Sequence, residues 1–188
     1  MPNMESIDKI IDNYVLKAAN DISFAWNYVT GKTKSQLANL TLTIGTMVAS
    51  TVSVLEGIVD QQGSALMAVP LYLFCAHGLQ SLNTRIDNLE AEALEANAKS
   101  LEAEKEKQNY CKHGYLFAAV GALFATIPDN TDGVIYPAQF CALYMMSLSA
   151  SSQIMRADYL PPCKNVLERM YDYVAGLFRK PVPATVKN

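Results

Sequence analysis

Apolar residues are concentrated in four stretches of the chain, each about as long as a membrane is thick. The stretches cover residues 37–59, 64–82, 110–127 and 134–155. About twenty helical residues, each adding 1.5 Å, cross a hydrocarbon core of ~30 Å. The pattern therefore predicts an all-α, polytopic integral membrane protein with four transmembrane helices.

The connections between these stretches are of two kinds. Residues 60–63 and 128–133 are short and rich in turn-forming residues, so the four predicted helices form two antiparallel hairpins. Residues 83–109 are rich in Ala, Glu, Lys and Leu and contain no Gly or Pro. This composition favours helix and predicts a cytoplasmic helical hairpin that turns near Asn97.

Two further segments are residues 4–30 and 164–178, in which apolar residues recur at helical spacing and polar residues fall largely on the opposite side. Each predicts an amphipathic helix that lies along the membrane surface or packs on a partner. Gly31 ends the first segment, and Pro161 and Pro162 precede the second.

Basic residues fall on one side of the predicted membrane. All fifteen Lys and Arg residues lie in residues 1–36, 83–113 and 156–188, and the two short connections contain none. Basic flanks are retained on the cytoplasmic side, so the N- and C-termini are both predicted to be cytoplasmic. The membrane is either the cell's inner or plasma membrane or the membrane of an organelle.

Length and composition add three expectations. The 188 residues suffice for a single membrane domain, and a net charge of −3 does not favour nucleic acid as a partner. The first thirty residues lack a basic start with a compact apolar core, so no cleavable signal peptide is expected and the first span is expected to direct insertion. The four cysteines are expected to be free thiols.

The sequence contains no spacing typical of a catalytic centre, such as HExxH, a phosphate-binding glycine loop or paired catalytic carboxylates. No catalytic residue, metal site or cofactor is therefore predicted. We expect a non-catalytic subunit or scaffold of a homo- or hetero-oligomeric membrane complex, with membrane lipids and other membrane subunits or further copies of itself as partners.

An alternative hypothesis is an oligomeric cation channel or pore. Glu56 lies near the outer end of the first span and Asp60 follows one turn later on the same face, with Ser53 and Thr46 further in. Rings of carboxylates formed by several copies would select cations at an outer mouth. The four spans, cytoplasmic termini and acidic outer position are superficially similar to calcium channels of the Orai type. This chain departs from them in lacking a long basic segment before the first span and a bulky apolar gate.

Other polar residues in the spans are expected to stabilise contacts between helices. His77 is expected to be packed between helices, and Asn39 to hydrogen-bond across them. The pairs Cys75-x-His77 and Cys111-x-His113 contain ligands suited to zinc or haem iron. Residues two apart on a helix point in different directions, so a metal or haem site would need ligands from both arms.

Overall fold

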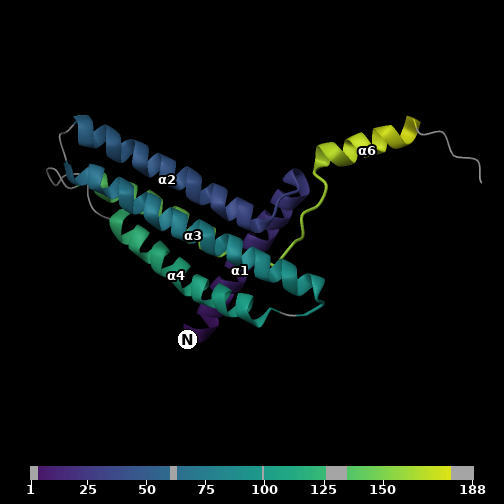
Figure 1. Ribbon diagram of the computed structural model, residues 1–188. Helices are drawn as coiled ribbons and strands as arrows, with labels where there is room; N and C mark the ends of the chain where they lie inside the picture. Colours follow the sequence, from purple (N-terminus) through teal and green to yellow (C-terminus); the bar gives the residue numbers. More distant parts are fainter. Residues whose placement is uncertain (1–3, 60–62, 99, 126–134, 179–188) are drawn as a thin grey trace, which may run out of the picture.

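The computed structural model describes residues 4–59, 63–98, 100–125 and 135–178. These residues form helices and no strand (Figure 1), so the predicted all-α fold class is confirmed for this part of the chain. The six helices are α1 (Met4–Thr30), α2 (Lys34–Val59), α3 (Gly63–Glu95), α4 (Leu101–Ala125), α5 (Ile135–Met155) and α6 (Val166–Phe178).

Helices α2 to α5 form a bundle of long helices (Figure 1). The chief contacts join α2 to α3, α2 to α5, and α4 to α5, whereas α3 and α4 touch each other less. Helix α1 crosses one end of this bundle and contacts α5 and α2. Helix α6 projects away from the bundle and contacts α1.

The turn between α3 and α4 lies where the sequence predicts it. Asn97 has a positive φ of 50°, a conformation that Asn adopts more readily than most residues. The Ala98 N–H donates to the Ala93 carbonyl at 2.9 Å, which closes the end of α3. The Ser100 hydroxyl then accepts the Ala103 N–H at 3.2 Å and caps α4. Helix α3 is continuous from Gly63 to Glu95, so it extends from the apolar residues into the charged segment, and the chain turns only after Glu95.

Two apolar clusters fill the bundle. One contains Ala38, Ile86, Tyr110, Ile154 and Met155, and the other contains Leu42, Ala49, Tyr72, Tyr144 and Leu148. Small residues bring helix backbones close together: a Cβ added at Gly45 of α2 would lie 2.2 Å from Ser147 Oγ on α5. Such close approach is typical of helix pairs that pack tightly in membranes.

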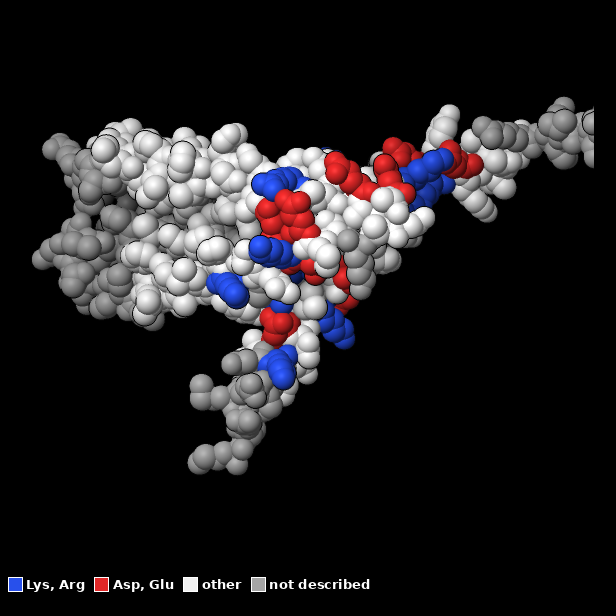
Figure 2. Space-filling view, turned by 60° about the horizontal axis from the view of Figure 1, so that its bottom comes forward, with Lys and Arg blue, Asp and Glu red and all other residues white. Residues whose placement is uncertain are grey.

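Charged side chains gather at one end of the bundle (Figure 2). Asp, Glu, Lys and Arg are absent from residues 35–55, 63–84, 113–125 and 135–155, which we call the uncharged shaft. Large apolar side chains are exposed along it, among them Ile44, Met47, Leu55, Met67, Leu71, Phe74, Leu116, Leu123 and Leu143. Soluble monomers rarely expose apolar surface on this scale.

Judged by length and hydropathy alone, one helix among the described residues is long and apolar enough to cross a membrane. This segment covers Lys34–Leu55, within α2. The other described helices do not meet this criterion, so the prediction of four transmembrane helices is not confirmed by it.

Candidate functional site

A buried ion-pair cluster joins three helices at the charged end of the bundle. The Glu90 carboxylate on α3 lies between two lysines, with Oε2 2.7 Å from Lys34 Nζ on α2 and Oε1 3.1 Å from Lys107 Nζ on α4. The Lys34 side chain is only 1% exposed, and its ammonium also donates to the Ala157 carbonyl. One carboxylate therefore connects α2, α3 and α4 where the charged hairpin begins.

The two lysines of this cluster have different electrostatic surroundings. Burial lowers the pKa of Lys34, and the Glu90 carboxylate offsets only part of this effect. Burial also opposes the charge on Lys107, but the carboxylates of Glu90 and Glu104 outweigh it and raise the pKa of Lys107. The Glu90 carboxylate therefore favours the charged form of both lysines, but only at Lys107 do the neighbouring carboxylates outweigh the effect of burial.

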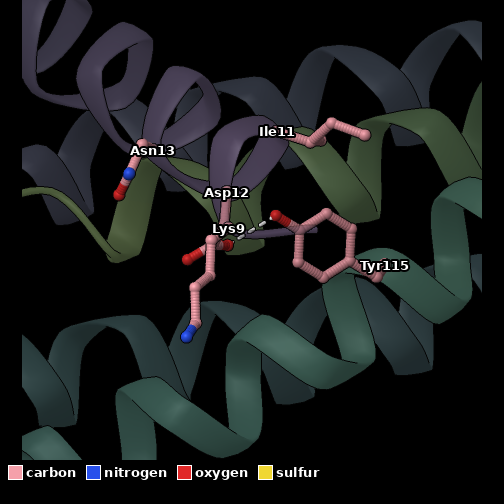
Figure 3. A pocket seen from close by; sticks show the side chains of 5 residues that line it. All are labelled: Lys9, Ile11, Asp12, Asn13 and Tyr115. Carbon is pink, nitrogen blue, oxygen red and sulfur yellow. Dashed lines mark hydrogen bonds between the residues drawn. The ribbon is translucent and has the colours of Figure 1, made fainter. Parts of the chain in front are cut away.

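A second arrangement, formed by Asp12, Tyr115 and Arg156 and called the α1 latch, fastens α1 to the bundle. Figure 3 shows the hydrogen bond between Tyr115 and Asp12. Arg156, directly after α5, donates from Nη2 to both oxygens of Asp12, at 2.8 and 2.9 Å. The Tyr115 hydroxyl of α4 donates to Asp12 Oδ1 at 2.7 Å. The Tyr115 hydrogen bond and Arg156 hold the pKa of the Asp12 carboxyl below its ordinary value, although partial burial opposes this. The latch borders a cleft that is also lined by Lys9, Ile11 and Asn13.

The segment before α6 is tied to the end of α1. Asn27 donates to the Pro161 carbonyl at 3.0 Å, and the Cys163 thiol donates to Asn27 Oδ1 at 2.8 Å. Gly31 has a φ of +73°, and a Cβ there would lie 2.3 Å from the Cys163 carbonyl oxygen. Arg169 of α6 stacks over the Tyr28 ring at 4.5 Å. The start of α6 is thus held in place although its apolar side chains are exposed.

A polar network crosses the bundle between the two apolar clusters. Asn83, which is fully buried, donates to Asn39 Oδ1 at 2.8 Å and to Ser151 Oγ at 3.2 Å, and accepts the Tyr110 hydroxyl at 2.9 Å. Gln80 adds a bond to Thr43 Oγ1 at 2.9 Å. Asn39 therefore does take part in hydrogen bonds between helices, as the sequence predicts. Asn83, at the centre of the network, was not singled out by the sequence.

The residues of the channel hypothesis are described only in part. Thr46 and Ser53 are 5% and 2% exposed, and lie beside Tyr144 and Tyr72 inside the chain's own bundle. Asp60 and the side chain of Glu56 lie outside the described residues. The described part of this face of α2 therefore packs within one chain.

Within the described chain the His77 side chain is exposed, so it does not pack between helices of the same chain. The ring borders the groove between α2 and α3, whereas His113 borders a cleft between α3 and α4. The two imidazoles lie in different grooves, and the described residues contain no group of three or more His, Cys, Asp or Glu that could hold a metal ion. The Cys111 side chain lies outside the description.

Sequence reasoning missed the ion-pair cluster and the α1 latch. A signal for the cluster does exist: Glu90 follows the buried Ile86 by four residues, and Lys107 follows the buried Ala103 by four. Each charged residue thus shares a helix face with a core residue. The chain matches no protein-family model, no curated protein and no solved structure.

Proposed function

We propose that this chain is a non-catalytic integral membrane subunit or scaffold whose uncharged shaft crosses the bilayer four times. The observation that carries the proposal is the separation of charge along the bundle (Figure 2). Residues 35–55 contain no charged side chain, and twenty-one helical residues extend ~31 Å, which matches a hydrocarbon core of ~30 Å.

The direction of the helices agrees with this proposal. The start of α2, the end of α3, the start of α4 and the end of α5 all lie at the charged end. All fifteen Lys and Arg residues of the chain fall in the segments that join or flank these ends. The positive-inside rule then assigns the charged end, both termini and the α3–α4 hairpin to the cytoplasmic side.

The two amphipathic helices support a role in assembly. Helix α6 is anchored by Arg169 on Tyr28, yet exposes Leu167, Met170, Tyr171, Val174 and Phe178. Helix α1 is latched by Asp12, yet exposes Ile10, Ile11, Tyr14, Ile22 and Phe24. Apolar surface held at a fixed position beside a membrane suits contact with lipid or another subunit.

The buried positions of Thr46 and Ser53 favour a scaffold over the alternative of a cation channel. In that alternative, copies of α2 surround a shared axis and expose this face to water. In the described chain the same face packs on Tyr72 and Tyr144.

Two measurements test the proposal. Membranes that contain the full chain are washed with alkaline carbonate, and the protein is expected to stay in the pellet, as an integral protein does. Mild detergent extraction followed by native electrophoresis is expected to give a species larger than one chain. Release of the protein into the carbonate wash contradicts membrane integration. A strictly monomeric species contradicts the role in assembly.

A further inference from the structure

One side of α1 carries a continuous row of exposed apolar side chains. The members of this row recur every three or four positions, so they lie along the same side of the helix. We call the row the α1 apolar flank, and it consists of Ile11, Tyr14, Ala18, Ile22, Ala25 and Val29. Its four larger side chains are each at least half exposed, and none of the six residues is charged.

The contacts of α1 fix the direction in which this flank faces. The side of α1 that packs on the bundle contains the buried Ala19. Next to it, Asn20 accepts the Asp158 N–H at 2.8 Å and Asn27 donates to the Pro161 carbonyl at 3.0 Å. Both partners lie beyond the end of α5, so the polar side of α1 is turned toward the charged end. The α1 apolar flank lies on the other side of the buried residues and is turned toward the uncharged shaft.

The position of Ile11 agrees with this direction (Figure 3). Ile11 projects on the side of α1 where the Tyr115 ring lies, and Asn13 projects on the opposite side. Tyr115 belongs to the uncharged stretch of α4, whereas Lys112, one turn earlier, belongs to the charged part. The α1 apolar flank therefore faces away from the charges of the hairpin.

The α1 latch places α1 at the level where the uncharged shaft begins. Tyr115 lies close to the start of the uncharged stretch 113–125, and Arg156 directly follows the uncharged stretch 135–155. Both side chains bond to Asp12 Oδ1, at 2.7 and 2.8 Å. In the proposed four-span arrangement this level is the boundary between the hydrocarbon core and the cytoplasmic headgroups. A helix at this boundary gains stability when its apolar side contacts acyl chains and its polar side contacts water.

The opposite side of α1 is suited to the headgroups and the cytoplasm. Lys9 and Lys17 are exposed there, and long lysine side chains can reach lipid phosphates while the helix lies deeper. Two rings on this side are paired within the chain: Phe24 stacks on Tyr28 with 6.3 Å between ring centroids, and Arg169 lies over Tyr28 at 4.5 Å. This side therefore combines cations with rings that belong to the junction with α6.

We propose that the α1 apolar flank binds lipid at the cytoplasmic surface of the membrane, a proposal that rests on the four-span function above. It assigns lipid, rather than another subunit, as the partner of this helix. A flank that begins at the edge of the shaft and is turned toward it continues the exposed apolar surface of the shaft. Where the shaft crosses a bilayer, the lipid around the shaft is what this flank meets. Because α1 crosses the bundle (Figure 1), the helix then lies along the membrane plane.

The test measures how close each side of α1 comes to lipid. Trp26 is the one tryptophan of the chain, so Trp26→Phe gives a background without tryptophan. Ile22→Trp and Tyr14→Trp then report from the flank, and Asn13→Trp and Lys17→Trp are matched controls at exposed positions on the other side of the same helix. Each full-length variant is reconstituted in phosphatidylcholine vesicles with and without brominated phosphatidylcholine, which quenches tryptophan fluorescence on contact.

Quenching at the two flank positions is expected to be at least twice as strong as at the two controls. Bromine attached near the headgroup is expected to quench the flank positions more than bromine attached near the bilayer centre, because the helix lies at the interface. Circular dichroism checks the helix content of each variant. Tyr14→Trp exchanges one aromatic residue for another at a position that is 72% exposed, so it provides a reading even if Ile22→Trp does not fold.

The contrary outcomes are distinct from one another. Equal quenching on the two sides of α1 overturns the assignment of the flank. Weak quenching at both flank positions, in protein that alkaline carbonate leaves in the membrane, overturns lipid binding by α1 while the four-span arrangement stands. Quenching at the flank that appears only after dilution of the protein in lipid shows that a second copy covers the flank, which also overturns the proposal. Release of the protein by carbonate contradicts the four-span function itself.

Discussion

Lys34 Nζ on α2 lies 2.7 Å from Glu90 Oε2 on α3, and these side chains are only 1% and 9% exposed. Lys107 approaches the other oxygen of the same carboxylate at 3.1 Å. The Glu90 carboxylate is thus buried between two lysines. Replacing any one of these three side chains leaves a charge without its partner in a region of low dielectric. The α2–α3–α4 junction is therefore expected to depend on Glu90 more than on any exposed carboxylate of the hairpin.

Glu90→Gln is expected to destabilise the protein by about 3–5 kcal/mol, because two buried ammonium groups lose their shared counter-charge. The measurement is unfolding of the detergent-solubilised protein by heat or denaturant. Glu92→Gln, an exposed change two residues away, is the control and is expected to shift stability by less than ~0.5 kcal/mol. Equal effects of the two variants contradict the role assigned to Glu90.

The α1 latch is expected to open in acid. The pKa of Asp12 is lowered in the folded chain, so its stabilising contribution is complete above the ordinary value of 3.8 and is lost as pH falls through the lower, folded value. Hydrogen exchange over residues 9–19, corrected for intrinsic rates, is expected to rise below about pH 4. Asp12→Asn is expected to raise exchange at neutral pH and to remove this acid response.

Asp21→Asn is the matched control for the latch, because Asp21 is an exposed carboxylate on the same helix. It should leave both the neutral exchange rate and the acid response as in the wild type. If Asp21→Asn and Asp12→Asn behave alike, the contact of Asp12 with Arg156 and Tyr115 does not control α1.

Asn83 is expected to be the most sensitive member of the polar network. Asn83→Ala removes hydrogen bonds to Asn39, Ser151 and Tyr110 at once and is expected to cost about 1–3 kcal/mol. Thermal unfolding in detergent measures the loss. Asn88→Ala, at an exposed position five residues further along α3, is expected to be nearly neutral. A neutral Asn83→Ala contradicts a structural role for the network.

Gly45→Ala is expected to destabilise the α2–α5 contact by about 1–3 kcal/mol, since the new Cβ would lie 2.2 Å from Ser147 Oγ. Gly78→Ala, by contrast, meets open space and is expected to be neutral or to stabilise the single chain by up to ~1 kcal/mol. Adding Ser147→Gly to Gly45→Ala is expected to recover part of the loss. Unfolding temperatures of the four proteins check this order, and a harmless Gly45→Ala contradicts the tight α2–α5 packing.

The sequence predicts the helices well because their signals are local. Gly31 and Pro161 mark breaks, and Asn97 provides the turn that separates α3 from α4. The pairings that organise the charged end are not local: Asp12 meets Arg156 across 144 positions. Periodicity assigns a residue to a face but not to a partner on another helix.

His77 illustrates a second limit of the sequence. Its place inside an apolar stretch suggested burial, yet the groove of α2 and α3 leaves the ring exposed. Which side of an apolar helix faces the interior depends on the neighbours of that helix, and hydropathy is the same for a buried side and a lipid-facing side. Likewise, only the fold shows that the Phe74 side chain is exposed and that a Cβ at Gly78 would meet open space in the described chain.

Protease sidedness tests the four-span arrangement most directly. In sealed vesicles with the non-cytoplasmic surface outward, added trypsin is expected to leave the chain intact, because every Lys and Arg lies in segments assigned to the other side. After permeabilisation, trypsin should cut the α3–α4 hairpin around Lys99 and Lys105. Cleavage in this hairpin before permeabilisation, in vesicles shown to be sealed, contradicts the arrangement.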